Sequence, residues 1–223
     1  MGTLRPARTI GSGYLEKAMS YTAYKKLIED LLVEGKSTGP HQSEAFNHYS
    51  QLNLQRMHRL EKTMQLLPDL KERVQQVGKA QIWLVLTEGW CGDAAQSIPV
   101  MNAFAQENSL IRLQFILRDE NLDLMDQYLT NGIARSIPKL IALDAVSHEE
   151  LFNWGPRPAP LQELFYRMKG GGMAFDAIKE ELQRWYNKDK TITIQQELGE
   201  LVWGAGDAGM EPRADGAESD ALP

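Results

Sequence analysis

The chain has 223 residues, of which 43% are hydrophobic and 24% charged, and its net charge at pH 7 is -6. This length fits one domain with extensions or two small domains, and the composition is that of a soluble protein able to bury a core. The acidic balance argues against a basic nucleic-acid-binding protein.

The sequence contains one cysteine, Cys91. A single thiol excludes a disulfide within the chain and a cysteine-rich zinc or iron–sulfur site built by one chain. It also fits a reducing compartment. The four histidines show no metal-ligand spacing, and we therefore expect no metal site: His41, His48, His58 and His148.

No apolar run approaches the ~20 residues that a membrane-spanning helix requires. Residues 1–13 contain arginines, glycines and a proline but lack the apolar core of a secretory signal. We therefore expect a cytoplasmic protein without membrane contact, with residues 1–13 as a mobile arm.

Helices are predicted for the segment 14–78. The first begins after Ser20 as N-cap and ends at Gly35, and a second follows the apolar stripe of residues 46–67. Pro68 interrupts the pattern, and residues 69–77 form a short third helix.

The pattern changes to alternating strands and helices over about 80–155. Short apolar runs rich in β-forming residues predict the strands, and helical stripes separate them. The order is strand 82–87, helix 93–108, strand 111–117, helix 121–129, and a hairpin of strands 139–143 and 150–154. This alternation predicts a compact α/β fold.

Helices return after the segment 154–158 (WGPRP), over about 161–168, 175–186 and 194–203. Residues 204–223 have almost no apolar mass, and we expect a disordered acidic tail. The chain is thus predicted to form one domain over 14–203, in which helical extensions 14–78 and 158–203 flank the sheet core.

Cys91 lies where a buried strand turns into a helix, in the stretch 87–100 (TEGWCGDAAQSIPV). At the N-terminus of a helix, unpaired N–H groups and the helix dipole lower the pKa of a thiol and make it nucleophilic. The alternative is that Cys91 is simply a small buried hydrophobic residue.

Two motifs resemble the thioredoxin family. Residues 90–94 (WCGDA) are similar to its W-C-G-P-C motif, and Pro99 follows where the family has a helix-kinking proline. Residues 132–138 (GIARSIP) resemble its G-I-x-x-I-P signature with one residue inserted. The resemblance covers about 82–154 and implies a thioredoxin-like fold in which Pro138 is cis and packs beside the sulfur. The N-terminal helices and WGPRP also resemble a bacterial branch of thioredoxin-like proteins.

The resemblance implies thiol–disulfide exchange by Cys91. Trp90 and Pro138 would form the apolar walls of a groove, although either residue could serve the fold alone. The substrate backbone would pair with Ile137 like an added strand, and Gly92 would lie in the same substrate-binding groove.

Three departures from the family pattern limit this mechanism. Ala94 replaces the second cysteine, so an external thiol such as glutathione must resolve any mixed disulfide. Asp93 replaces a proline; its charge should raise the pKa of the thiol, while it stabilises the first helical turn, and the sequence does not rank the two effects. Val85 occupies the position of the family's buried acid. Glu88 either substitutes for that acid or is a solvated charge at the strand end.

Arg157 is held between two prolines in WGPRP. A guanidinium fixed in this way suits a carboxylate or phosphate of a ligand. A structural turn, in which Arg157 forms a salt bridge to the N-terminal helices, explains the same residues, and we favour it.

Three functions fit the sequence. The favoured one is a monothiol oxidoreductase that acts on protein or small-molecule disulfides, with no bound cofactor and with glutathione or another low-molecular-weight thiol as co-substrate. The second is a redox-inactive module that binds proteins or peptides, and the third is a single-thiol redox sensor. The terminal helices either pack on the sheet or mediate a homodimer.

Overall fold

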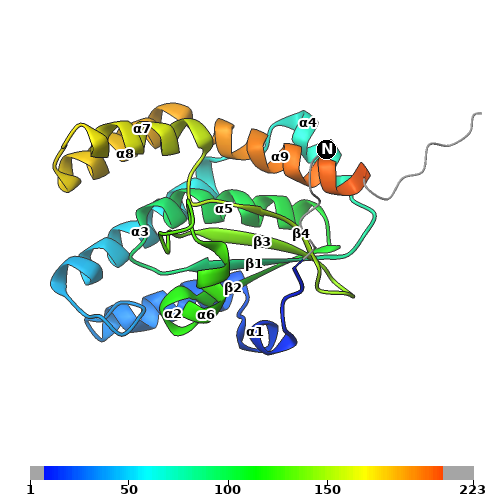
Figure 1. The fold of residues 1–223 in the computed structure, drawn as a ribbon, viewed down its shortest axis with the longest axis horizontal. Coiled ribbons are helices and arrows are strands. Elements are labelled where there is room, and N and C mark those ends of the chain that lie inside the picture. Colours follow the sequence, from blue (N-terminus) through cyan, green and yellow to red (C-terminus); the bar gives the residue numbers. More distant parts are fainter. Residues whose placement is uncertain (1–7, 208–223) are drawn as a thin grey trace, which may run out of the picture.

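In the computed structural model, which describes residues 8–207, four strands form one mixed sheet (Figure 1). The strands are β1 (Gln81–Thr87), β2 (Ile111–Leu117), β3 (Lys139–Asp144) and β4 (Glu150–Trp154), in the order β2-β1-β3-β4. β1 pairs in parallel with β2 and antiparallel with β3, and β3 and β4 form the expected hairpin. Every residue of β1 is buried, which explains why its sequence is a continuous apolar run.

Helices cover both faces of this sheet (Figure 1). One face carries α1 (Ser12–Lys17), α2 (Tyr21–Val33) and α6 (Leu122–Met125); the other carries α5 (Gly92–Glu107), α4 (Pro68–Gln75) and α9 (Ile192–Asp207). The long helix α3 (Glu44–Thr63) packs against α5 and α2, and α7 (Ala159–Gly170) packs against α8 (Phe175–Asp189). The α/β fold predicted from the strand and helix pattern is therefore confirmed, with helical extensions on both sides of the sheet core in the sequence.

Ser20 caps α2 as predicted, because its hydroxyl accepts the Ala23 N–H at 3.2 Å. The single helix predicted over 121–129 is only partly correct. The segment is helical from Leu122 to Tyr128, but it changes from the short α6 to a 3-10 turn, η2 (Asp126–Tyr128). Another 3-10 turn, η1 (Arg118–Glu120), precedes it, and between the two Asn121 is not helical and its side chain donates to the Leu117 carbonyl at 2.8 Å.

Residues 8–13 are anchored, which corrects the expectation of a mobile arm for this part of 1–13. Thr9 bridges to Glu149 beside the hairpin, and the Ile10 N–H donates to the His148 carbonyl at 3.0 Å. Ile10 is buried in the core. An isolated apolar residue without periodic neighbours gives no helical or strand signal, so this docking could not be read from the sequence. Residues 1–7 lie outside the described residues.

The last described helix also differs from the prediction. α9 continues to Asp207, whereas the tail was expected to start at residue 204. The remainder of the predicted tail, residues 208–223, lies outside the described residues.

Candidate functional site

Cys91 is the N-cap residue of α5, directly after the turn that follows β1. The residue is 8% exposed, and its thiol donates to the Ile137 carbonyl, with 3.2 Å between Sγ and oxygen. The Ile137–Pro138 peptide bond is cis. The two motifs singled out in the sequence, 46 positions apart, therefore meet at the sulfur.

The surroundings of Cys91 hold its proton on the sulfur. Burial, with the Asp93 carboxylate as the next cause, raises the pKa of the thiol to about 12. The N–H groups of Ala94 and Asp93, at the start of α5, and the Arg157 guanidinium act in the opposite direction. The pKa-lowering effect of the helix N-terminus is thus present but is outweighed by desolvation and by a neighbouring negative charge.

Asp93 is the centre of a buried polar cluster. Its carboxylate forms an ion pair with Arg157 at 2.7 Å and accepts the Tyr186 hydroxyl at 2.9 Å. Burial raises the pKa of Asp93, while Arg157 and Tyr186 act to lower it. The Arg157 guanidinium also lies over the Phe165 ring, 4.4 Å from its centroid. The favoured prediction that Arg157 pairs with the N-terminal helices is wrong, because it pairs with the helix that carries the thiol.

The conformation of Gly155 positions the WGPRP segment so that Arg157 reaches the Asp93 carboxylate. Its φ is +111°, and a Cβ here would lie 2.2 Å from the Pro138 carbonyl oxygen, so only glycine fits. Lys139 donates to the Gly155 carbonyl at 2.9 Å. The turn is therefore locked against the strand that follows the cis-proline, and the chain leaves it toward Asp93.

Trp90 lies between the turn and the N-terminal helices. Its ring stacks on Phe46 at a centroid distance of 4.9 Å, and the Arg118 guanidinium lies 5.1 Å from its centroid. The indole N–H is buried and has no hydrogen-bond acceptor among the residues that the structure describes.

Glu88 is fully buried, so the interpretation of a solvated charge at the strand end is wrong. Its Oε1 accepts the Asp119 N–H at 2.8 Å, while Oε2 has no hydrogen-bond partner within residues 8–207. Burial raises the pKa of Glu88 to about 7, although the hydrogen bond from Asp119 acts to lower it. The Tyr24 hydroxyl lies 3.3 Å from the side-chain oxygen of Thr87, the residue before Glu88.

A cavity of about 360 Å³ opens at the thiol. Six of the seven predicted site residues line it, namely Trp90, Cys91, Gly92, Asp93, Ile137 and Arg157; Pro138 does not. The remaining wall comes from residues that the sequence did not single out as site residues, among them Phe46, Tyr49 and Arg56 of α3, and Phe175 and Lys179 of α8. No local pattern marks these residues, because only the packing of the helical extensions brings them to the thiol.

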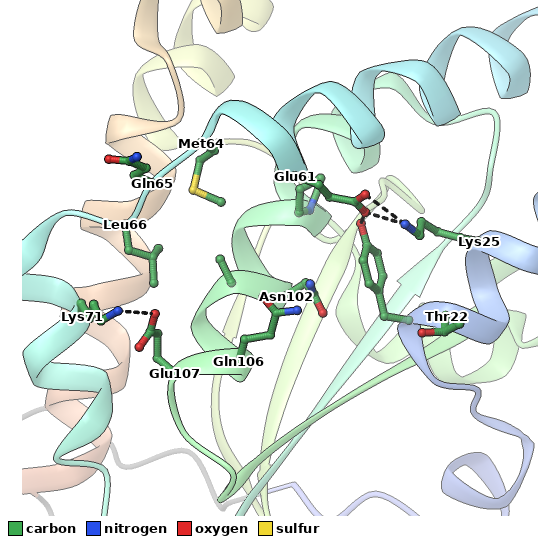
Figure 2. A pocket seen from close by; sticks show the side chains of 13 residues that line it. Thr22, Lys25, Glu61, Met64, Gln65, Leu66, Lys71, Asn102, Gln106 and Glu107 are labelled. Carbon is green, nitrogen blue, oxygen red and sulfur yellow. Dashed lines mark hydrogen bonds and ion pairs between the residues drawn. The ribbon is translucent and has the colours of Figure 1, made fainter.

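A larger cavity, of about 670 Å³, lies elsewhere, between α2, α3, α4 and α5 (Figure 2). Its charged groups already have partners: Lys25 pairs with Glu61 at 2.8 Å, and Lys71 pairs with Glu107 at 2.9 Å. It contains neither a nucleophile nor an unsatisfied charge, so we take the smaller cavity at Cys91 as the candidate site.

Within residues 8–207, no group of three or more histidine, cysteine, aspartate or glutamate side chains is arranged to hold a metal ion. None of the helices in this part of the chain combines the length and apolar character needed to cross a bilayer.

A family model described as Thioredoxin matches residues 39–169, more than half of the chain. No curated protein matches the sequence. A solved structure of a protein of unknown function from Pseudomonas aeruginosa is similar, with a TM-score of 0.58 and 16% identity over 89% of this chain and 99% of that chain. An HIV epitope scaffold aligns with a TM-score of 0.45 and 19% identity over 85% and 94% of the two chains.

Proposed function

The chain belongs to the thioredoxin family, and from this premise we propose that it exchanges thiols and disulfides through one sulfur, that of Cys91. The observation that carries the proposal is that the Cys91 thiol and the Ile137 carbonyl, which belong to the two separate motifs, meet at the wall of a cavity. A buried cysteine with only a packing role needs neither this cavity nor the charged cluster around Asp93.

The reaction has two steps. Cys91 loses its proton, and the thiolate attacks one sulfur of a disulfide R–S–S–R′. The bond between the two substrate sulfurs breaks, a bond from Sγ to the attacked sulfur forms, and R′–S⁻ leaves and takes up a proton. The product is a mixed disulfide between Cys91 and R–S, on a protein or small-molecule substrate.

The second step needs a thiol from outside the chain. Ala94 stands where a resolving cysteine would attack, so an external thiol, such as glutathione, attacks the R–S sulfur of the mixed disulfide as its thiolate. The bond between that sulfur and Sγ breaks, a new disulfide between R–S and the external thiol leaves, and Sγ takes up a proton. This exchange suits a reducing compartment such as the cytoplasm, where low-molecular-weight thiols are abundant.

Ile137 links protonation to substrate binding in this scheme. Its carbonyl accepts a hydrogen bond from the Cys91 thiol in the free protein. Once Cys91 has reacted, the carbonyl is free to accept a backbone N–H from an extended substrate. Trp90, which lines the cavity beside Cys91, would confine that substrate at the sulfur.

One observation favours a second function, that of a redox-inactive binding module. A thiol with a pKa of about 12 is almost entirely protonated at neutral pH, so Cys91 is a poor nucleophile in the free protein. In that case the cavity binds a partner group without covalent chemistry.

Trapping on the intact protein separates the two functions. The protein is incubated with a small disulfide, and the mass of Cys91-containing peptides is measured, with Cys91→Ser as control. Exchange predicts an adduct on Cys91 that a monothiol removes. Absence of any adduct, under conditions in which the unfolded chain reacts, supports the binding module instead.

A further inference from the structure

The cavity at Cys91 concentrates positive charge on an acidic protein. Five of its lining residues are cationic, whereas Asp93 is its single carboxylate. The cations come from α3, from η1 and the loop before β3, from the WGPRP turn and from α8: Arg56, Arg118, Arg135, Arg157 and Lys179. The whole chain, by contrast, has a net charge of -6. Four of these cations already pair with carboxylates: Arg157 with Asp93, Arg118 with Asp119, Arg135 with Asp126 and Lys179 with Asp176. The remaining excess of positive charge in the lining favours an anionic ligand.

Arg56 is the cation whose charge is least satisfied. It forms no ion pair in the described part of the chain, and its Nη1 donates only to the Asn53 side-chain oxygen, at 2.9 Å. Burial and the neighbouring Arg59 lower its pKa. A partly buried cation without a carboxylate partner is costly, and a bound anion would relieve that cost. Nη1 lies 3.6 Å from the point where a Cβ on Gly92 would stand, beside Cys91 in sequence.

Lys179 supplies a second charge from α8. Its Nζ donates to the Tyr49 hydroxyl at 2.7 Å and pairs with Asp176, whose side chain is 88% exposed. An ion pair with a carboxylate in water is weak, so Lys179 can exchange this partner for a ligand. α3 and α8 thus each offer a cation to one cavity.

The rest of the wall suits a small organic molecule. Phe46 and Trp90 form a stacked apolar surface, and the buried indole N–H of Trp90 lacks an acceptor among residues 8–207. A volume of about 360 Å³ is at the lower end of the range for small-molecule sites. The thiol itself is almost inaccessible, so a reagent has to enter the cavity to reach it.

We propose that this cavity binds a low-molecular-weight disulfide or thiol that carries two or more carboxylates, and that Arg56 is the residue that selects for them. One carboxylate binds Arg56, a second binds Lys179, and the sulfur reaches Cys91. The part of the proposal that concerns reaction rests on the proposed function of Cys91.

The test uses three small disulfides of similar size and different charge: 3,3′-dithiodipropionate, which is a dianion, bis(2-hydroxyethyl) disulfide, which is neutral, and cystamine, which is a dication. The rate of mixed-disulfide formation on Cys91 is measured by mass spectrometry and divided by the rate for the urea-unfolded chain, which corrects for intrinsic reactivity. We expect the dianion to exceed the neutral compound by about tenfold and the dication to be slowest. Equal corrected rates would overturn the proposal.

Arg56→Gln tests the selecting residue. The ratio of dianion to neutral rates should fall by about tenfold in this variant. Using the ratio within one variant cancels any change in the reactivity of the thiol. Arg59→Gln is the matched control, because Arg59 is exposed, lies one turn further along α3 and does not line the cavity. A ratio that falls equally in both variants, or in neither, contradicts a selecting role for Arg56.

Binding to Cys91→Ser keeps the two proposals apart, because this variant has no thiol to react. Calorimetry with the dianionic disulfide should give saturable binding that Arg56→Gln weakens in the same background. If Cys91→Ser binds the dianion but the wild type forms no adduct, the proposed exchange fails and the anion site stands. If the wild type reacts with all three disulfides without preference, the exchange stands and the anion site fails.

Discussion

Replacing Asp93 by Asn should make Cys91 more reactive. Burial raises the pKa of the thiol, and the Asp93 carboxylate is the next cause. Asn has nearly the same shape and can still accept hydrogen bonds from Tyr186 and Arg157, but it has no negative charge. The variant also leaves the positive charge of Arg157 uncompensated, which favours the thiolate further.

The magnitude follows from the pKa of about 12. At pH 7 the thiolate fraction of wild-type Cys91 is lower than that of a free cysteine by on the order of 10³-fold. The greater intrinsic nucleophilicity of a basic thiolate recovers part of this loss, so alkylation should be on the order of 10²-fold slower than in the unfolded chain. A neighbouring like charge shifts a pKa by about one to three pH units, and Asp93→Asn should therefore accelerate alkylation about 3- to 40-fold.

The assay is the rate of alkylation by iodoacetamide, a neutral reagent, between pH 6 and 10. Asp126→Asn is the matched control, because Asp126 also pairs with a cavity arginine, Arg135, but is not among the causes that shift the pKa of Cys91. Circular dichroism must show that the variants remain folded, since an uncompensated Arg157 costs about 3 to 5 kcal/mol. Wild-type and Asp93→Asn proteins that alkylate at the same rate, both folded, would refute the electrostatic reasoning.

Three further predictions concern other parts of the site. Ala94→Cys places a second thiol one helical turn from Cys91. The variant should reduce insulin disulfides, with dithiothreitol as the reductant, at least about tenfold faster than the wild type. An equal rate would mean that the missing thiol is not what limits exchange. Gly155→Ala should cost about 2 to 4 kcal/mol in urea denaturation, because its Cβ would overlap the Pro138 carbonyl, whereas Gly132→Ala, also at positive φ but with free space, should cost only about 1 kcal/mol; equal losses would contradict the overlap. The pKa of Glu88 is raised on folding to about 7, so its contribution to stability is fully present below about pH 4.5 and is lost as pH rises through about 7. Between pH 4.5 and 8, the free energy of unfolding of Glu88→Gln, measured by urea titration, should therefore rise by about 3 kcal/mol relative to that of the wild type. A difference that stays constant with pH would show that Glu88 does not titrate in this range.

The sequence determines the local frame of this site. A buried apolar strand, a Gly-containing turn and the helix that starts after it can be predicted from neighbouring residues, since strand and helix periods and turn residues act over a few positions. For the same reason the hairpin, with Lys139 at the start of its first strand, is where the pattern places it. The absence of a second cysteine, with Ala94 in its place, is likewise a property of the sequence alone.

Only the tertiary structure determines the pKa of the thiol, the partner of Arg157 and the charges that surround the cavity. The pKa of Cys91 is raised because residues distant in the chain bury the thiol. Arg157 reaches Asp93 because the turn before it packs against Pro138, and only glycine fits at position 155 of that turn. Two of the five cations in the cavity wall, Arg56 and Lys179, come from α3 and α8, which are ordinary amphipathic helices when considered alone. Desolvation and charge pairing act between residues that are distant in sequence and close in space, so no local pattern encodes them.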